Sequence, residues 1–192
     1  MYRKVVKRAI DIILSALGLI LLSWLYLIIA VAIVIDDPGP VFFSQKRIGI
    51  HKSIFMCHKF RSMKMSTPHD TPTHLLENPD QYITRIGKFL RKSSLDELPQ
   101  IWDIFIGKMS IIGPRPALWN QDDLVAERDK YGANDVKPGL TGWAQINGYR
   151  GDTSIKRRIE YDIFYIENWT LSFDIKIMFL TIFKGFINKN AY

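Results

Sequence analysis

An apolar run near the N-terminus constrains this chain more than any other part of its sequence. Nearly every residue from Ile12 to Ile35 is apolar. A helix of this length rises about 36 Å, which is enough to cross a bilayer. The run ends in an acidic, proline-containing segment, residues 36–40, without a small-residue cleavage site, which disfavours a signal peptide. The sequence therefore predicts a membrane helix.

Basic residues lie on both sides of this run, and basic residues near membrane segments tend to stay on the cytoplasmic side. Two topologies account for this: a re-entrant hairpin that enters and leaves by the same face, or a simple span whose following domain does not influence topology. A soluble buried core helix is a distant third. The basic residues are Arg3, Lys4, Lys7 and Arg8 before the run, and Lys46, Arg47, Lys52, Lys59, Arg61 and Lys64 after it.

Length, charge and cysteine content narrow the class of protein. A chain of 192 residues suits one domain with a sizeable core. Its formal net charge of +7 favours anionic partners, such as phosphorylated substrates, lipid headgroups or nucleic acid. Cys57 is the single cysteine, which excludes an internal disulfide framework and fits a reducing compartment.

The rest of the chain predicts an α+β, mostly helical fold with a small β-hairpin. Two segments rich in aromatic and β-branched residues surround a short turn, and a polar, proline-containing loop follows them. Apolar residues at helical spacing come next. The predicted elements are strands at 41–49 and 53–63, a surface loop at 64–80, and helices at 79–91, 118–131 and 154–167.

The last predicted helix, residues 171–187, is mostly apolar with a narrow polar stripe that includes Asp174 and Thr181. Such a helix fits the membrane interface, and it fits a buried core equally well. Residues 98–106 form a second apolar surface of this kind. Together with the membrane helix, these segments predict a membrane-associated domain with interfacial amphipathic helices.

Two adjacent carboxylates, Asp96 and Glu97, have two interpretations. Locally, Ser94 and Glu97 match a capping box, and Asp96 suits the first turn of a helix. The same position supports chemistry, because an ionised Asp96 can attack phosphorus beside N–H groups that hold a phosphate. A neighbouring carboxylate can help to bind Mg²⁺. This second interpretation makes Asp96 and Glu97 candidate catalytic residues and metal ligands.

Basic residues from separate segments offer positive charge for a nucleotide diphosphate. Arg115 lies between Pro114 and Pro116, which fix the backbone around a guanidinium able to clamp a diphosphate. No Walker-type loop and no recognisable nucleic-acid module occurs in the sequence, so nucleic acid is not an expected partner. The other candidate substrate-binding residues in this group are Lys59, Arg61 and Arg91.

Six ordered segments, distributed along almost the whole chain, carry most of these features. They are Lys7–Asp11, Val41–Gly49, Lys59–Met63, Leu90–Gln100, Met109–Pro116 and Lys137–Gly148. Together they resemble the small monotopic phosphoglycosyl transferases of bacteria, which start capsule, O-antigen, exopolysaccharide and glycoprotein glycans. The resemblance is to members without the additional N-terminal membrane domain of larger relatives.

The resemblance implies transfer of a sugar-1-phosphate from a UDP-sugar to polyprenyl (undecaprenyl) phosphate. The residue matching Asp96 attacks the phosphate that carries the sugar and expels UMP. Polyprenyl phosphate then attacks the phosphosugar on the enzyme. Lys137 and Gln145, in the last segment, are further candidate substrate-binding residues. The implied location is the bacterial inner membrane, with the catalytic domain and both termini on the cytoplasmic face.

One position departs from the family pattern. Family members usually carry Ser-Pro at the bend of a re-entrant helix, whereas here Ser23 is followed by Trp24 and the apolar run contains no proline. Without proline, a helix lacks its commonest kink. We therefore expect residues 1–38 to form a membrane helix region, re-entrant or spanning, and residues 39–192 to form a cytoplasmic catalytic domain with interfacial helices.

A second hypothesis requires no chemistry. A membrane-tethered, non-catalytic module could use its basic surface to recruit anionic ligands or an assembly partner. Such a module would tolerate Asp96→Asn and Glu97→Gln, but it would lose binding when the charge of Arg115 is reversed.

Overall fold

The structure, a computed structural model, describes residues 2–67, 78–149 and 154–187. It is mostly helical with a small antiparallel hairpin, which confirms the predicted α+β class. Ten residues of the predicted loop at 64–80, residues 68–77, lie outside the described part. The helices are α1 (Lys7–Leu21), α2 (Ser23–Asp36), α3 (Arg85–Ser93), α4 (Gln100–Phe105), α5 (Asp122–Asp129), α6 (Trp143–Ile146), α7 (Ile155–Glu167) and α8 (Leu171–Ile187), and the strands are β1 (Phe42–Ile48), β2 (Ile54–Phe60), β3 (Ser110–Ile112) and β4 (Gly139–Thr141).

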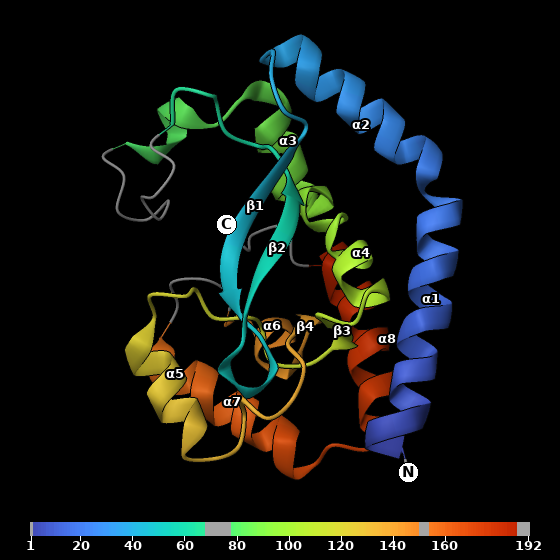
Figure 1. Ribbon diagram of the computed structural model, residues 1–192, viewed down its shortest axis with the longest axis vertical. Coiled ribbons are helices and arrows are strands. Elements are labelled where there is room, and N and C mark those ends of the chain that lie inside the picture. Colours follow the sequence, from blue (N-terminus) through green and yellow to red (C-terminus); the bar gives the residue numbers. More distant parts are fainter. Residues whose placement is uncertain (1, 68–77, 150–153, 188–192) are drawn as a thin grey trace.

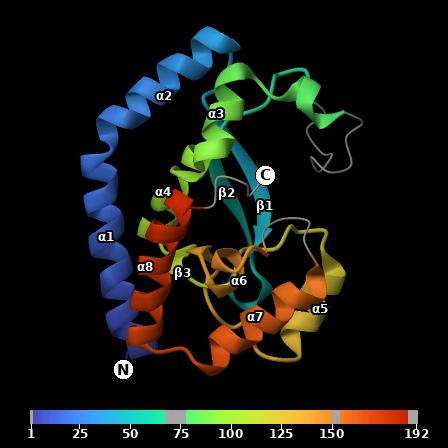
Figure 2. The same cartoon turned by 180° about the vertical axis from the view of Figure 1, so that it is seen from behind.

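The apolar run forms two helices instead of one. A π-helical turn, Tyr2–Val6, leads into α1, and α1 and α2 are bent by 59° relative to each other. The pair forms an arm along one edge of the molecule, with the hairpin at the centre (Figures 1 and 2). Within the described residues, no single helix has the length and apolarity needed to cross a membrane, and α1 and α2 meet that criterion only as a bent pair.

The bend forms although the run lacks proline. Leu22 joins the two helices with φ −98° and ψ 2°, so the backbone departs from α-helical geometry at this one residue. The Ser23 hydroxyl donates to the Ile20 carbonyl at 2.8 Å. On the two sides of the bend the partners differ, because α1 lies along α4 whereas α2 lies along α3. Tertiary packing thus accompanies a kink that proline produces in other helices.

The predicted hairpin is confirmed. β1 and β2 pair antiparallel, with Phe42 opposite Phe60. Phe55, Cys57 and Lys59 share one face of β2, because alternate residues of a strand point the same way. Phe55 and Cys57 on that face pack against buried residues of α4 and of the segment after it. The hairpin therefore directs Lys59 into the protein.

The helix predicted at 79–91 is wrong as one element. A 3-10 turn begins at Pro79 and ends at Tyr82, and α3 begins separately at Arg85. Thr84 separates them, since its hydroxyl accepts the backbone N–H of Gly87, in the first turn of α3, at 2.9 Å as a helix cap. The helices predicted at 118–131, 154–167 and 171–187 occur as α5, which is shorter than expected, α7 and α8.

A short parallel pair, β3 and β4, was not predicted. Ser110 pairs with Gly139, and Ile112 pairs with Thr141. The backbones approach so closely that a side chain at Gly139 would collide with the backbone of Gly113. This close approach brings the proline-framed Arg115 loop beside the segment that follows Lys137.

The polar stripe of α8 faces the protein and its apolar side is exposed, so α8 is not the fully buried core helix of one of the two interpretations. Asp174 is 4% exposed, and the Thr181 hydroxyl lies 2.8 Å from the hydroxyl of Thr141. Conversely, Phe179 and Phe183 on the apolar side are 55% and 61% exposed. The stripe therefore does not face water as it would on a peripheral helix; α8 exposes apolar side chains instead, as do α1, α2 and α4.

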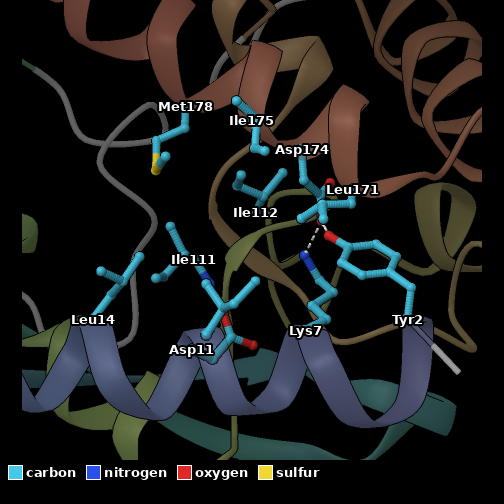
Figure 3. A pocket seen from close by; sticks show the side chains of 11 residues that line it. Tyr2, Lys7, Asp11, Leu14, Ile111, Ile112, Leu171, Asp174, Ile175 and Met178 are labelled. Carbon is cyan, nitrogen blue, oxygen red and sulfur yellow. Dashed lines mark hydrogen bonds and ion pairs between the residues drawn. The ribbon is translucent and has the colours of Figure 1, made fainter.

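A polar seam joins α1 to α8. The Lys7 ammonium lies 2.6 Å from the carboxylate of Asp174, which also accepts hydrogen bonds from the hydroxyls of Tyr2 and, at 2.8 Å, Tyr165. Figure 3 shows Lys7 and Tyr2 reaching from the N-terminal helical segment toward Asp174. A cation and two phenols thus satisfy one buried carboxylate.

Asp11 extends this seam to β3. Its carboxylate accepts from the Ser110 hydroxyl at 3.1 Å and from the Ile111 N–H at 2.9 Å. A small cavity has both Asp11 and Asp174 in its lining. The rest of the lining consists mostly of apolar side chains of α1, β3 and α8 (Figure 3). The seam therefore fixes the start of the helix pair against the rest of the protein.

Candidate active site

Asp96 and Glu97 lie in a three-residue 3-10 turn, Leu95–Glu97, between α3 and α4. Ser94 precedes the turn with φ 58°, in the left-handed region, and its side chain does not cap the turn. The predicted capping box is therefore wrong. The Glu97 carboxylate binds cations from two distant segments, because buried ion pairs outweigh one local hydrogen bond.

Two cations hold Glu97. The Lys59 ammonium lies 2.8 Å from Oε1, and the Arg115 guanidinium lies 2.6 Å from Oε1 and 3.3 Å from Oε2. Burial opposes ionisation of Glu97, but Arg115 and Lys59 outweigh it and hold the pKa of this carboxyl well below its usual range. Glu97 in turn raises the pKa of Arg115. Glu97 is thus ionised and orients two cations.

Asp96 has a different environment although it is the next residue. It is 7% exposed, and the Lys59 ammonium is 3.9 Å from its Oδ2. Within the described part of the chain, its carboxylate accepts no hydrogen bond. Burial raises the pKa of Asp96, while Lys59 opposes this rise and Glu97 adds to it. Asp96 is therefore the carboxylate with oxygens still available for chemistry.

Three arginines, the buried Arg128 and Arg158 and the half-buried Arg47, hold the backbone of the Arg115 loop. Arg128 and Arg158 donate to the Arg115 carbonyl at 3.0 Å and 2.8 Å, and Arg47 donates to the Pro116 carbonyl at 3.1 Å. The two prolines were expected to make this loop rigid. The three arginines add a tertiary restraint, which aims the Arg115 side chain at Glu97.

Positive charge exceeds negative charge in this part of the interior. Asp162 pairs with Arg128, but Arg158 and Arg47 each bury an Nε that has no hydrogen-bond partner among the described residues. Burial and the nearby Arg128 lower the pKa of Arg158 to about 9, and burial and Arg115 lower that of Arg47 to about 10. A bound anion would relieve this imbalance.

Sequence reasoning missed this arginine cluster. A signal for part of it was present, because Arg158, Asp162 and Tyr165 recur at spacings of four and three and therefore share one face of α7. Ile159 lies beside them in the same buried surface. Charged residues within an apolar stripe indicate buried pairing.

The structure separates two of the predicted basic residues. Arg91 donates to the Ser62 hydroxyl at 2.9 Å and is close enough to Asp96 to lower its pKa. Arg61 instead binds the carboxylate of Asp37 at 2.8 Å, and it also donates to the Asp37 carbonyl. Arg61 thus anchors the end of α2, whereas Arg91 belongs to the carboxylate site.

Lys137 and Gln145 do not contact Asp96 or Glu97 in the described structure. The Lys137 ammonium and the Arg8 guanidinium both lie beside Gly107, near the start of α1. Burial and Arg8 lower the pKa of Lys137. The Gln145 amide donates to the Leu140 carbonyl at 3.0 Å, and its Oε1 is buried without a hydrogen-bond partner in the described region. Both residues remain candidates for binding.

The donor groups fit a metal only in part. Among the described residues, no group of three or more His, Cys, Asp and Glu lies close enough to hold an ion. Both Glu97 oxygens already bind Lys59 or Arg115, so a metal at Glu97 would displace a cation. Asp96 has free oxygens, and Mg²⁺ commonly uses one or two carboxylates with substrate phosphates and water.

Several curated proteins resemble this chain over nearly its whole length. UDP-glucose:undecaprenyl-phosphate glucose-1-phosphate transferases are 45% identical in Escherichia coli (strain K12) and in Xanthomonas campestris pv. campestris, covering 98% and 100% of this chain. A UDP-N-acetylgalactosamine-undecaprenyl-phosphate N-acetylgalactosaminephosphotransferase of Aeromonas hydrophila is 40% identical over 92% of it. The matched regions span 42%, 41% and 43% of these relatives' own lengths, respectively.

The family assignment agrees with the ordered motifs and with the site that they build. The sequence profile of the family described as bacterial sugar transferase matches residues 2–188. That match includes the apolar helix pair, the hairpin that carries Lys59, the Asp96-Glu97 turn and the Arg115 loop. The chain belongs to the bacterial sugar transferase family.

Proposed function

We propose that this protein transfers a sugar-1-phosphate from a UDP-sugar to undecaprenyl phosphate, giving the polyprenyl-diphosphate sugar and UMP. The observation that carries the proposal is the contrast between the two adjacent carboxylates. Glu97 is committed to Lys59 and Arg115, whereas Asp96 keeps free oxygens beside a surplus of buried positive charge. The printed names of the relatives support the same donor and acceptor classes.

The proposed reaction has two balanced steps. In the first, an Asp96 oxygen attacks the phosphorus that bears the sugar, and the bond to the UMP oxygen breaks, so that UMP leaves. In the second, an oxygen of undecaprenyl phosphate attacks that phosphorus, the acyl–phosphate bond breaks, and the Asp96 carboxylate is restored. Lys59 and Arg115, oriented by Glu97, stabilise charge on the phosphate oxygens.

We propose Mg²⁺ as the cofactor, held by Asp96 and donor phosphate oxygens. Glu97 would join it only by giving up one of its cations. When bound, the ion offsets the negative charge of the diphosphate. The residues of the chain supply the remaining charge, because Arg115, Lys59 and Arg91 approach the two carboxylates from three separate segments.

We propose that residues 1–38 act as a re-entrant membrane helix region and residues 39–192 as the cytoplasmic catalytic domain at the inner membrane. The bent pair and the exposed apolar sides of α1, α2, α4 and α8 support this. A covering of lipid would remove that apolar surface from water. Reporter labelling that placed Met1 outside the cell would contradict the re-entrant arrangement.

The test is UMP release without acceptor. Purified protein with Mg²⁺ is given a panel of UDP-sugars, and we expect one UMP per enzyme from the correct donor. The intact mass should rise by one sugar phosphate. Asp96→Asn should reduce the release by at least about 1,000-fold, as losses of nucleophiles do.

Asp123→Asn is the matched control, because it removes an exposed carboxylate on α5 and should leave release unchanged. UMP release that requires undecaprenyl phosphate would replace the covalent intermediate with direct transfer. No UMP release by the wild type from any donor of the panel, together with unchanged binding of the UDP-sugar in Asp96→Asn, would favour the non-catalytic basic module.

A further inference from the structure

Tyr26 of the bent helix pair reaches the backbone next to the proposed catalytic carboxylates. It lies on α2, four residues after Leu22 at the bend. Its hydroxyl donates to the Leu98 carbonyl at 2.6 Å. Leu98 directly follows Glu97, so the phenol binds the end of the turn that carries both carboxylates.

The ring of Tyr26 also contacts the hairpin. It packs edge-on against Phe60, with ring centroids 5.2 Å apart, and Phe60 itself is 1% exposed. Phe60 directly follows Lys59. Lys59 and Glu97 form an ion pair, with the Lys59 Nζ 2.8 Å from the Glu97 Oε1. Tyr26 therefore contacts the residue that follows each member of this pair. One side chain connects α2 to both halves of that pair.

The catalytic turn has weak internal support. It is three residues long, and its own hydrogen bonds, Glu97 N–H to Ser94 O and Leu98 N–H to Leu95 O, both measure 3.2 Å. Such short 3-10 turns have poorer hydrogen-bond geometry than α-helices. The Leu98 carbonyl accepts one further bond, from the Ile101 N–H of α4 at 2.9 Å. An additional tie at Leu98 thus restrains the turn directly.

We propose that Tyr26 is a positioning residue that holds the Asp96-Glu97 turn against the Lys59 hairpin. The geometry of the site then depends on how the bent helix pair packs against the rest of the protein. The inference rests on the proposed function for its kinetic consequences. Geometry supports it independently, since no other described side chain of α1 or α2 hydrogen-bonds to residues 94–98. Catalysis that depends on placement loses rate when a support is removed.

Tyr26→Phe is the test, because it removes the hydroxyl and keeps the ring against Phe60. In steady-state UMP release from nanodisc-embedded protein supplied with undecaprenyl phosphate, we expect kcat to fall about 5- to 10-fold, the scale of one lost hydrogen bond. The KM for the UDP-sugar should stay within about twofold, because the phenol does not touch the substrate-binding cations. An unchanged kcat would overturn the proposal.

Tyr2→Phe, in the π-helical turn that leads into the same helix pair, is the matched control. Its hydroxyl also makes one hydrogen bond, to Asp174 in the seam, so both variants lose one tyrosine bond from the N-terminal segment. Tyr2→Phe should keep kcat within about twofold of wild type, since the seam lies away from the turn. An equal loss of kcat in both variants would mean that Tyr26 acts only through general stability.

One further measurement does not depend on that kinetic ratio. Hydrogen exchange of the backbone across residues 94–101 should accelerate in Tyr26→Phe and not in Tyr2→Phe. Unchanged exchange would overturn the proposal even in a protein that released no UMP, so its failure and that of the proposed function are distinguishable.

Discussion

Two carboxylates, the buried Asp174 and the partly buried Glu97, are each bound by cationic or hydroxyl donors, yet their surroundings differ. Asp174 in the α1–α8 seam accepts from Lys7, Tyr2 and Tyr165, so one negative charge meets one positive charge. Glu97 meets Lys59 and Arg115, and behind them lie further buried cations. The seam is balanced, whereas the site carries surplus positive charge.

This difference supports a structural role for the seam and the proposed catalytic role for the Asp96-Glu97 site. In the seam, Lys7, Tyr2 and Tyr165 all bind the Asp174 carboxylate, and buried polar groups need such partners in order not to cost stability. In the site, two buried guanidinium Nε groups lack partners within the described residues, and Asp96 accepts no hydrogen bond there. Unmatched charge of this kind is expected where a phosphorylated substrate completes the balance.

Arg115→Met should have the largest effect, because it removes a cation from the unbalanced cluster. We expect kcat/KM for UMP release to fall about 100- to 1,000-fold, as for loss of one transition-state donor. The free energy of unfolding, measured by thermal unfolding, should also fall by about 3–5 kcal/mol, because Glu97 keeps only Lys59 as a charge partner. Arg157→Met, on the exposed side of α7, is the matched control and should leave both unchanged. A normal kcat/KM in Arg115→Met would contradict the proposed role of Arg115 in catalysis.

Asp174→Asn tests the balanced cluster and should separate stability from catalysis. Loss of the charge partner of Lys7 should lower the free energy of unfolding by about 2–4 kcal/mol, measured by thermal unfolding in detergent. The kcat of the protein that remains folded should stay within about twofold of wild type, because the seam does not contact Asp96 or Glu97. A loss of kcat without a loss of stability would contradict the structural role.

The pH dependence should distinguish Asp96 from Glu97. Asp96 has a raised pKa, so the acid limb of kcat should lie above the ordinary aspartate value of about 3.9. Glu97 has a lowered pKa, so its contribution to stability is present above its unfolded pKa and is lost as pH falls through the folded one. Activity should therefore fall at a higher pH than stability, as measured by UMP release and unfolding across pH. Coincident transitions would contradict this order.

Lys137→Met should have the smallest effect on the donor reaction. Its ammonium lies beside Arg8 and Gly107, so we expect the KM for the UDP-sugar to change by less than about threefold. The same substitution at Lys59 provides the comparison, because it removes a cation that binds Glu97. Equal effects of the two variants on the KM would place Lys137 at the donor site after all.

Local signals predicted much of the fold. The hairpin, α7 and α8 occur where strand and helix patterns placed them, because residue spacing within one element is enough to indicate them. The separate start of α3 could have been expected from Thr84, a favoured cap residue. The parallel pairing of β3 with β4 left no such pattern, since each strand has only three residues.

The candidate site was predicted in its residue types and only partly in its arrangement. Asp96, Glu97 and Arg115 were singled out from their sequence neighbours, and the structure brings all three together with Lys59. Arg61 was expected beside them and lies on Asp37 instead. Its position near the end of β2 could not show which carboxylate would reach it.

By itself, the sequence determined an apolar N-terminal helix region, a β-hairpin, and a pair of carboxylates within reach of basic residues. Tertiary structure alone decided the bend at Leu22, the inward polar stripe of α8, and which cations bind Glu97. The reason is range: periodicity and capping act within a few residues, whereas Lys59 and Arg115 meet Glu97 across 38 and 18 positions of the chain. Which charges meet in the interior depends on how the helices and the hairpin pack, and that packing leaves Asp96 available for chemistry.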